Sequence, residues 1–252
     1  MDIDALIAEV REAKKYRGID EATIARICRE EAAKHARPED AAKAAKRKLH
    51  QIAGAFLGGA ARWLEAPAEE LLRAHASTRE RIAFAEAFYA DIESCAGVPG
   101  RVLDLACGLH PLQYLGCRAA GGLPMPAYAA YDIHREALEI VRRFFVSFGI
   151  DGLARPLDLL CDMPDTEADL AFLLKIAPLL ERQCAGSFER VLAGVRARFV
   201  AVSFPTRSLG GARFGMATQY RRFFSECLAR GGHRLLLEKA YPNELLFVVK
   251  KA

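Results

Sequence analysis

The chain has 252 residues, of which 52% are hydrophobic and 27% charged, and its formal net charge is +4. This length suits one large domain or a medium domain with a small one, and the chain contains no run of about 18 or more apolar residues that could span a membrane. Its seven cysteines are dispersed without a Cys-x-x-Cys pair and its first residues are polar, which predicts a cytoplasmic protein without a secretory signal, a membrane anchor or a metal site.

The first third of the chain has the apolar spacing of helices. Apolar residues repeat at helical intervals over residues 3–10, and Asp20 is a suitable N-cap for a second helix. Pro38 suits the first turn of a third helix, where its missing N–H has no cost. A fourth short helix is expected over residues 62–75.

The boundary between two predicted domains lies near residue 76. Residues 1–76 are expected to form a small all-α domain, because short helices are marginal on their own and need a common core. Ser77-Thr78-Arg79-Glu80 has a capping-box pattern, which predicts the start of a further helix that stops by Gly97. This helix opens the second predicted domain, residues 77–252.

Beyond residue 100, predicted strands alternate with predicted helices. Strands are expected over 101–105, 127–131, a short segment ending at Asp158, 170–174 and 199–203, and helices over 134–148, 178–196 and 217–229. This alternation predicts an α/β fold with a parallel sheet, helices on both faces and right-handed crossovers. The tail, residues 233–250, predicts an antiparallel hairpin instead. A sheet that ends in this way is typical of Rossmann-like methyltransferases.

The most informative motif follows the first predicted strand. Asp104-Leu105-Ala106-Cys107-Gly108 is followed 24 residues later by Asp132, at the end of the second strand. A strand, a tight turn of small residues and a second strand ending in a carboxylate hold a nucleoside-bearing cofactor across neighbouring strand ends. Only one glycine stands where a pyrophosphate cradle needs three, so S-adenosylmethionine is favoured over NAD. The alternative is a buried strand, a glycine turn and an incidental aspartate.

Several segments taken together resemble one enzyme family. They are His75–Arg81, Asp104–Leu109, Tyr131–His134, Pro178–Glu181 and Val202–Gly211, with shorter matches at Ala13–Arg17 and Lys48–His50. In this order they resemble the aminoglycoside-resistance 16S ribosomal RNA methyltransferases. The resemblance implies S-adenosylmethionine as cofactor and methylation of guanine N7 in the decoding site of the assembled 30S subunit. It also implies aminoglycoside resistance and a monomeric enzyme.

Cofactor-binding residues are expected at the strand ends. Asp132 would bind the ribose hydroxyls, unless it only caps the helix that begins near His134. Asp104 would hold the cofactor amino group unless it pairs with a neighbouring loop, and Asp158 would accept from the adenine amino group unless it is an ordinary turn residue. The remaining expected contacts on these turns are Ala106, Cys107, Gly108, Ile133 and Leu159. The resemblance adds His75, Thr78 and Arg81, of which Arg81 could instead be a surface residue.

The target-base side of the site is expected after the fourth and fifth strands. Lys175 would face the active cleft, or else extend from the strand end as a solvated lysine. Phe204 would stack on the flipped guanine, or else pack in the core, and Arg207 would reach the guanine edge or a phosphate. These residues would position the base, and no general base is expected because guanine N7 has a lone pair and no proton.

Two basic segments predict a polyanionic partner. Contacts to rRNA phosphates are expected from Lys14, Lys15, Arg17, Lys46, Arg47, Lys48 and Arg213. Residues 190–225 contain seven arginines and no acidic residue, which also favours such a partner. The alternative is a solvated basic face that acids from elsewhere in the fold balance.

Two other functions stay open from the residues alone. The chain could be an S-adenosylmethionine-dependent methyltransferase of another RNA or of a small molecule, with the basic helices as an accessory domain. It could also be a non-catalytic RNA-binding protein that kept the fold. Methyl transfer to purified small ribosomal subunits distinguishes the 16S rRNA methyltransferase from a methyltransferase with another substrate. Cofactor binding distinguishes both enzymes from the non-catalytic RNA-binding protein.

Overall fold

A seven-stranded sheet forms the centre of the computed structural model, which describes residues 1–53, 66–206 and 216–252. The strands are β1 (Arg101–Leu105), β2 (Ala127–Asp132), β3 (Gly152–Pro156), β4 (Ala168–Leu174), β5 (Ala197–Pro205), β6 (Arg234–Tyr241) and β7 (Glu244–Lys250). Their order is β3-β2-β1-β4-β5-β7-β6, and β7 is antiparallel to both of its neighbours while the other pairs are parallel. The predicted parallel sheet and its C-terminal hairpin are confirmed.

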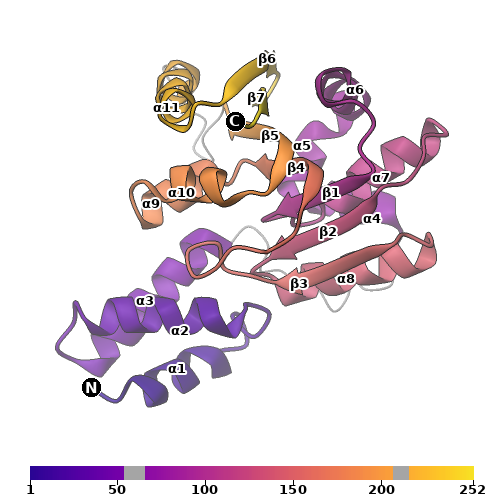
Figure 1. Ribbon diagram of the computed structural model, residues 1–252. Helices are drawn as coiled ribbons and strands as arrows, with labels where there is room; N and C mark the ends of the chain where they lie inside the picture. The colour runs from indigo at the N-terminus through magenta and orange to yellow at the C-terminus, as the bar shows by residue number, and fades with distance from the viewer. Residues whose placement is uncertain (54–65, 207–215) are drawn as a thin grey trace.

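Helices cover both faces of this sheet (Figure 1). One face packs against α6 (Ala85–Ala96), α7 (His110–Ala120) and α8 (Arg135–Ser147), and the other against α9 (Ala177–Gln183), α10 (Ser187–Gly194) and α11 (Met216–Gly231). Neighbouring strand residues alternate between the two cores, so Val102 faces the first and Leu103 the second. Both faces of the central strands are therefore buried, as in other doubly covered parallel sheets.

Three helical elements differ from their predictions. The helix α7 was not expected, and Pro111 lies in its first turn. The single helix expected over 178–196 is two helices, because Gly186 adopts φ 76° between α9 and α10. The capping box at Ser77 is wrong: α5 (Ala76–Arg81) has His75 as its N-cap, and the His75 ring nitrogen accepts from the Thr78 N–H. In addition, β3 ends at Pro156 rather than at residue 158.

The helices α1 (Ile3–Glu12), α2 (Glu21–Ala32) and α3 (Pro38–Ala53) form an N-terminal module with its own core, which includes Val10, Ile27 and Leu49. Asp2 and Asp20 cap the first two helices through their carboxylates. In Figure 1 the module lies below the sheet, next to the ends of the strands. Two short helices, α4 (Ala68–Ala74) and η3 (Ile82–Phe84), flank α5. Across the described ranges, no helix has the length and apolar character needed to cross a membrane.

Candidate functional site

A cleft with two adjoining lobes lies at the carboxyl edge of the sheet. Residues that line both lobes are Ile52, Ala106, Asp132, Ile133, Ile176 and Leu179. The first lobe also includes His75, Ser77, Arg81, Asp104, Cys107, Gly108, His110 and Lys175, and the second includes Thr23, Arg26, Leu157, Asp158, Leu159 and Gln183. Every cofactor-binding residue expected from the sequence, except Thr78, therefore lines one of the two lobes.

Asp132 stands where the two lobes meet, and its carboxylate is held from both sides. Oδ2 accepts from the Gly108 N–H at 2.8 Å, and Oδ1 accepts from the His134 N–H at 2.8 Å. His134, not Asp132, occupies the N-cap position of α8. Since each carboxylate oxygen accepts more than one hydrogen bond, these backbone contacts orient Asp132 and leave acceptor capacity toward the cleft.

The turn after β1 brings its backbone close to this carboxylate. Ala106 and Gly108 have φ of 56° and 51°, and the Cys107 N–H donates to the Tyr131 carbonyl at 3.0 Å. A Cβ atom on Gly108 would lie 2.7 Å from the His75 Nε2 atom, so only glycine fits there. Burial raises the pKa of the Cys107 thiol well above its ordinary value, and this thiol is therefore not a nucleophile at neutral pH.

Asp104 belongs to a buried polar cluster behind the same turn. Its Oδ2 accepts from the Tyr128 hydroxyl at 2.8 Å and lies 2.7 Å from the His110 Nδ1 atom. The Asp104 side chain is 1% exposed and lines the first lobe. His110, which begins α7, is thus a contact of the predicted carboxylate that the sequence alone did not indicate.

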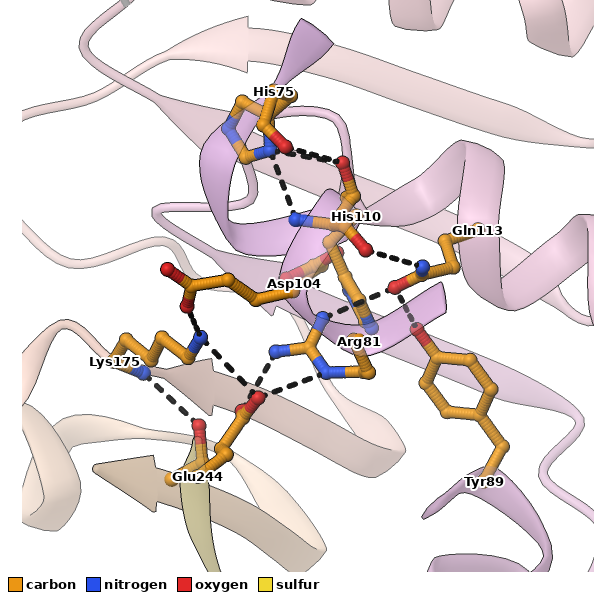
Figure 2. A network of polar contacts seen from close by, with 11 residues as sticks. His75, Arg81, Tyr89, Asp104, His110, Gln113, Lys175 and Glu244 are labelled. Atoms are coloured by element: carbon orange, nitrogen blue, oxygen red, sulfur yellow. Dashed lines mark hydrogen bonds and ion pairs between the residues drawn. The ribbon is translucent and has the colours of Figure 1, made fainter. Parts of the chain in front are cut away.

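Arg81, Lys175 and Glu244 form a second buried polar network, which is held by ion pairs (Figure 2). Arg81 Nη2 lies 2.6 Å from Glu244 Oε1, and both side chains are fully buried. Lys175 Nζ lies 2.8 Å from Glu80 Oε2 and 3.4 Å from Glu244 Oε2. Burial alone raises the pKa of Glu244, but Arg81 and Lys175 outweigh it and hold that pKa below its ordinary value of 4.5. The network keeps two cations at the wall of the first lobe.

The positions of these side chains can be compared with the sequence-based predictions. Arg81 is not a surface residue, and Lys175 lines the cleft with a side chain that is 13% exposed. Glu244 was missed, although an acid that opens an otherwise apolar strand is a signal for a buried cation partner. Thr78 does not line the cleft, and its buried hydroxyl donates to the Leu72 carbonyl at 2.8 Å.

His75 contributes a neutral ring to the first lobe. Its side chain is buried, and burial lowers its pKa to about 3, with the charge of Arg81 as the next cause. The Nδ1 atom serves as the cap of α5, 3.3 Å from the Thr78 nitrogen. The ring therefore acts as a hydrogen-bonding wall of the cleft rather than as a cation.

In the second lobe, Asp158 is oriented by two donors. Its Oδ2 accepts from Arg26 Nε at 2.9 Å, and its Oδ1 accepts from the Leu160 N–H at 2.9 Å. Leu157 and Leu159 line the lobe beside it. Arg26 belongs to α2 of the N-terminal module, and no motif in the sequence indicated it.

The expected base-stacking role of Phe204 is wrong. This side chain is fully buried, and its ring stacks on Tyr220 with centroids 4.8 Å apart and packs edge-on against Phe247. Adjacent strand residues point to opposite faces, so Ser203 turns toward Lys175 while Phe204 enters the core under α10 and α11. Arg207 and Arg213, expected to contact RNA, lie outside the described residues.

The predicted phosphate contacts of the N-terminal module divide into two groups. Lys14, Lys15, Arg17 and Arg47 are exposed. Lys46 is bound to Glu9 at 2.6 Å, and Lys48 is bound to Glu30, so these two charges are neutralised within the module. The first group is the one available to an RNA backbone.

The arginine-rich stretch 190–225 is also partly balanced by acids from other elements. Arg196 pairs with Asp165 and Glu167, and Arg221 pairs with Glu238. The alternative of a basic face neutralised in space therefore holds for these two arginines. Residues 190–225 contain only basic charges in the sequence, but acidic residues from other elements lie beside some of these arginines in the structure.

Comparisons with known proteins identify the family of this chain. The family model of the FmrO ribosomal RNA methyltransferases matches residues 58–248. A 16S rRNA (guanine(1405)-N(7))-methyltransferase from Serratia marcescens is 36% identical and covers 100% of this chain and 99% of that protein, and one from Frankia casuarinae is 32% identical over 99% of this chain and 94% of that protein. The solved structure of the 16S rRNA methyltransferase RmtF in complex with S-adenosyl-L-homocysteine matches with a TM-score of 0.87 and 33% identity, over 100% of both chains. The solved structure of the 16S rRNA methylase RmtB matches with a TM-score of 0.86 and 33% identity, over 100% of this chain and 99% of RmtB. The chain thus belongs to the FmrO family of ribosomal RNA methyltransferases.

Proposed function

We propose that this protein transfers a methyl group from S-adenosylmethionine to N7 of guanine 1405 in 16S rRNA, the activity that its curated relatives carry in their names. The observation that carries the proposal is the position of Asp132 at the junction of the two lobes. The expected consequence is resistance to aminoglycosides that bind the decoding site.

The two lobes differ in chemistry, and the difference suits the two ends of this cofactor. The second lobe has apolar walls and one oriented carboxylate, Asp158, which can accept from an adenine amino group. The first lobe has Arg81 and Lys175 for a carboxylate and Asp104 for an ammonium group. Asp132 between them can accept from both ribose hydroxyls. The glycine at 108, where a Cβ has no room, allows the close approach that such a cofactor needs.

When bound, S-adenosylmethionine supplies an electrophilic methyl group on a sulfonium centre. Guanine N7 has a free lone pair, so the protein needs to remove no proton before transfer. The polar groups of the first lobe are engaged with one another: Glu244 holds Arg81 and Lys175, and Asp104 holds His110. We infer that these residues act by holding the reactants in line and excluding water, which is a large contribution to rate in bimolecular reactions.

Recognition of RNA is proposed for the exposed cations of the N-terminal module, Lys14, Lys15, Arg17 and Arg47. Contacts to phosphates position a protein without reading sequence. Specificity would then come from the shape of the folded RNA, so we propose the assembled 30S subunit, and not naked 16S rRNA, as the substrate. The enzyme would act as a monomer and in the cytoplasm, where these subunits are found.

The test is methyl transfer from labelled S-adenosylmethionine to purified 30S subunits, with the modified nucleotide mapped by mass spectrometry. We expect label at guanine 1405, little label in naked rRNA, and aminoglycoside resistance in cells that express the protein. Asp132→Ala serves as the control that abolishes transfer. Label in another RNA would support the broader methyltransferase alternative, and cofactor-independent RNA binding without transfer would support the non-catalytic one.

A further inference from the structure

Helix α2 of the N-terminal module forms part of the wall of the second lobe. Thr23 and Arg26, three residues apart and so on one face of the helix, both line this lobe next to Asp158. The module was expected to contact RNA, and nothing in the sequence placed it at the cofactor cleft. Its contribution to the cleft therefore needs its own explanation.

Arg26 uses its whole guanidinium group to join three elements. Nε donates to Asp158 Oδ2 at 2.9 Å, one terminal nitrogen donates to Glu30 at 2.8 Å, and the other donates to Gln183 of α9 at 2.9 Å. Its side chain is 14% exposed and that of Asp158 is 5% exposed. Burial lowers the pKa of Arg26, but Asp158 and Glu30 outweigh this and raise it above its ordinary value, so the cation is permanent.

None of the described residues forms a hydrogen bond with the Thr23 hydroxyl. The residue is fully buried. A buried hydroxyl without a partner costs about 1–3 kcal/mol. Because Thr23 lines the second lobe, a polar group of a bound ligand is the partner that would remove this cost.

Backbone contacts tie α2 firmly to the same edge of the sheet. The Asp20 N–H, at the start of α2, donates to the Ile133 carbonyl at 2.7 Å, and the Arg135 N–H donates to the Gly18 carbonyl at 2.8 Å. Ile19 forms an antiparallel bridge with His134. These contacts involve the three residues that directly follow Asp132, so they hold the start of α2 close to the carboxylate at the lobe junction.

We propose that α2 is part of the cofactor site: the Thr23 hydroxyl hydrogen-bonds to the adenine of the bound cofactor, and Arg26 is the positioning residue that orients Asp158 toward the same ring. This inference rests on the proposed function. Adenine offers ring nitrogens that only accept and an amino group that donates. A hydroxyl can donate a hydrogen bond to a ring nitrogen, whereas a carboxylate such as that of Asp158 offers only acceptor oxygens. The N-terminal module thus carries cofactor affinity in addition to RNA contacts.

The experiment is calorimetric titration of the full-length protein with S-adenosylhomocysteine and, separately, with methylthioadenosine, which lacks the amino-acid end. Thr23→Val should weaken the binding of both ligands by the same factor, about 3- to 10-fold, which is the usual effect of one hydrogen bond. Arg26→Met should weaken the binding of both ligands by about 10- to 100-fold, because the charge-assisted hydrogen bond that orients Asp158 is lost. Arg26→Lys should recover part of this loss, because it keeps the ion pair but not the fork of donors. The matched control is Arg29→Met, an exposed position on the same helix.

Thermal unfolding without ligand separates a ligand contact from a structural role. Because Thr23→Val removes a buried hydroxyl that has no partner in residues 1–53, 66–206 and 216–252, this variant should melt at the same or a higher temperature than the parent while it binds the ligands less well. If Thr23→Val binds both ligands as tightly as the parent, the proposed Thr23 contact is wrong. If Arg26→Met binds both ligands as tightly as the parent, the proposed positioning role of Arg26 is wrong. Loss confined to S-adenosylhomocysteine overturns the assignment to adenine. Failure of the parent to bind S-adenosylhomocysteine at all would instead reject the proposed function.

Discussion

Substitution of Glu244 by Gln tests the buried ion-pair network at the wall of the cleft. In the parent, Glu244 accepts from Arg81 through both carboxylate oxygens, at 2.6 and 3.2 Å, and lies 3.4 Å from Lys175. Glu80 is the second acid of the network, so two cations face two carboxylates. Glu244→Gln leaves one uncompensated positive charge at a site where the Arg81 and Glu244 side chains are fully buried.

The expected cost follows from this burial. Breaking a buried pair by removing one partner costs about 3–5 kcal/mol, because the other charge stays desolvated. For a chain of this size each kcal/mol shifts the melting temperature by about 2–4 °C, so Glu244→Gln should melt about 6–20 °C below the parent. Glu80→Gln is the matched control: the Glu80 side chain is 40% exposed and that of Lys175 is 13% exposed. Because water reaches Glu80, this pair should contribute less than the fully buried Arg81–Glu244 pair, about 1 kcal/mol.

Thermal unfolding followed by circular dichroism at neutral pH measures both variants. The double variant Arg81→Leu with Glu244→Leu should recover much of the loss, because removing both charges leaves none unpaired. Glu244→Gln melting within about 2 °C of the parent would refute the reasoning, because the network would then not carry the stability that its burial implies. Equal losses in Glu244→Gln and Glu80→Gln would refute it as well.

Three further predictions concern the cleft wall, its pH response and the RNA surface. Gly108→Ala should abolish S-adenosylhomocysteine binding in calorimetry, because its Cβ would lie 2.7 Å from His75, whereas Gly149→Ala, with a φ of 60° and no atom within 4 Å, should cost only about 1 kcal/mol in stability and bind normally. Burial lowers the pKa of His75 to about 3, so between pH 6.5 and 3 only the unfolded chain binds a proton at this ring, and the stability of the fold decreases as the pH falls. His75→Asn, which keeps an acceptor for the helix cap, should therefore show a smaller decrease in melting temperature between pH 7 and 5 than the parent. Parallel plots of melting temperature against pH for the two proteins would contradict this. Lys15→Glu with Arg47→Glu should weaken 30S binding and its salt dependence in filter assays while S-adenosylhomocysteine binding stays unchanged.

The spacing of small residues and carboxylates predicted the centre of the cleft correctly. Parallel strands end at one edge, so residues that follow β1 and β2 must lie close together, and Gly108 and Asp132 are indeed hydrogen-bonded at 2.8 Å. Local capping was harder to predict. The Ser77 pattern and the His75 cap differ by only two positions, and which one begins the helix depends on how His75 packs beside Gly108.

The sequence by itself determined the parallel α/β sheet, its antiparallel hairpin and the strand-end motif, because periodicity and turn residues are local properties. Only the tertiary structure decided which side chains meet across long separations. Arg81 and Glu244 are 163 residues apart, and Arg26 and Asp158 are 132 apart. Phe204 shows the same limit within one strand: when both faces of a strand are buried, alternation does not say which face meets the cleft, and packing against the surrounding helices makes that choice.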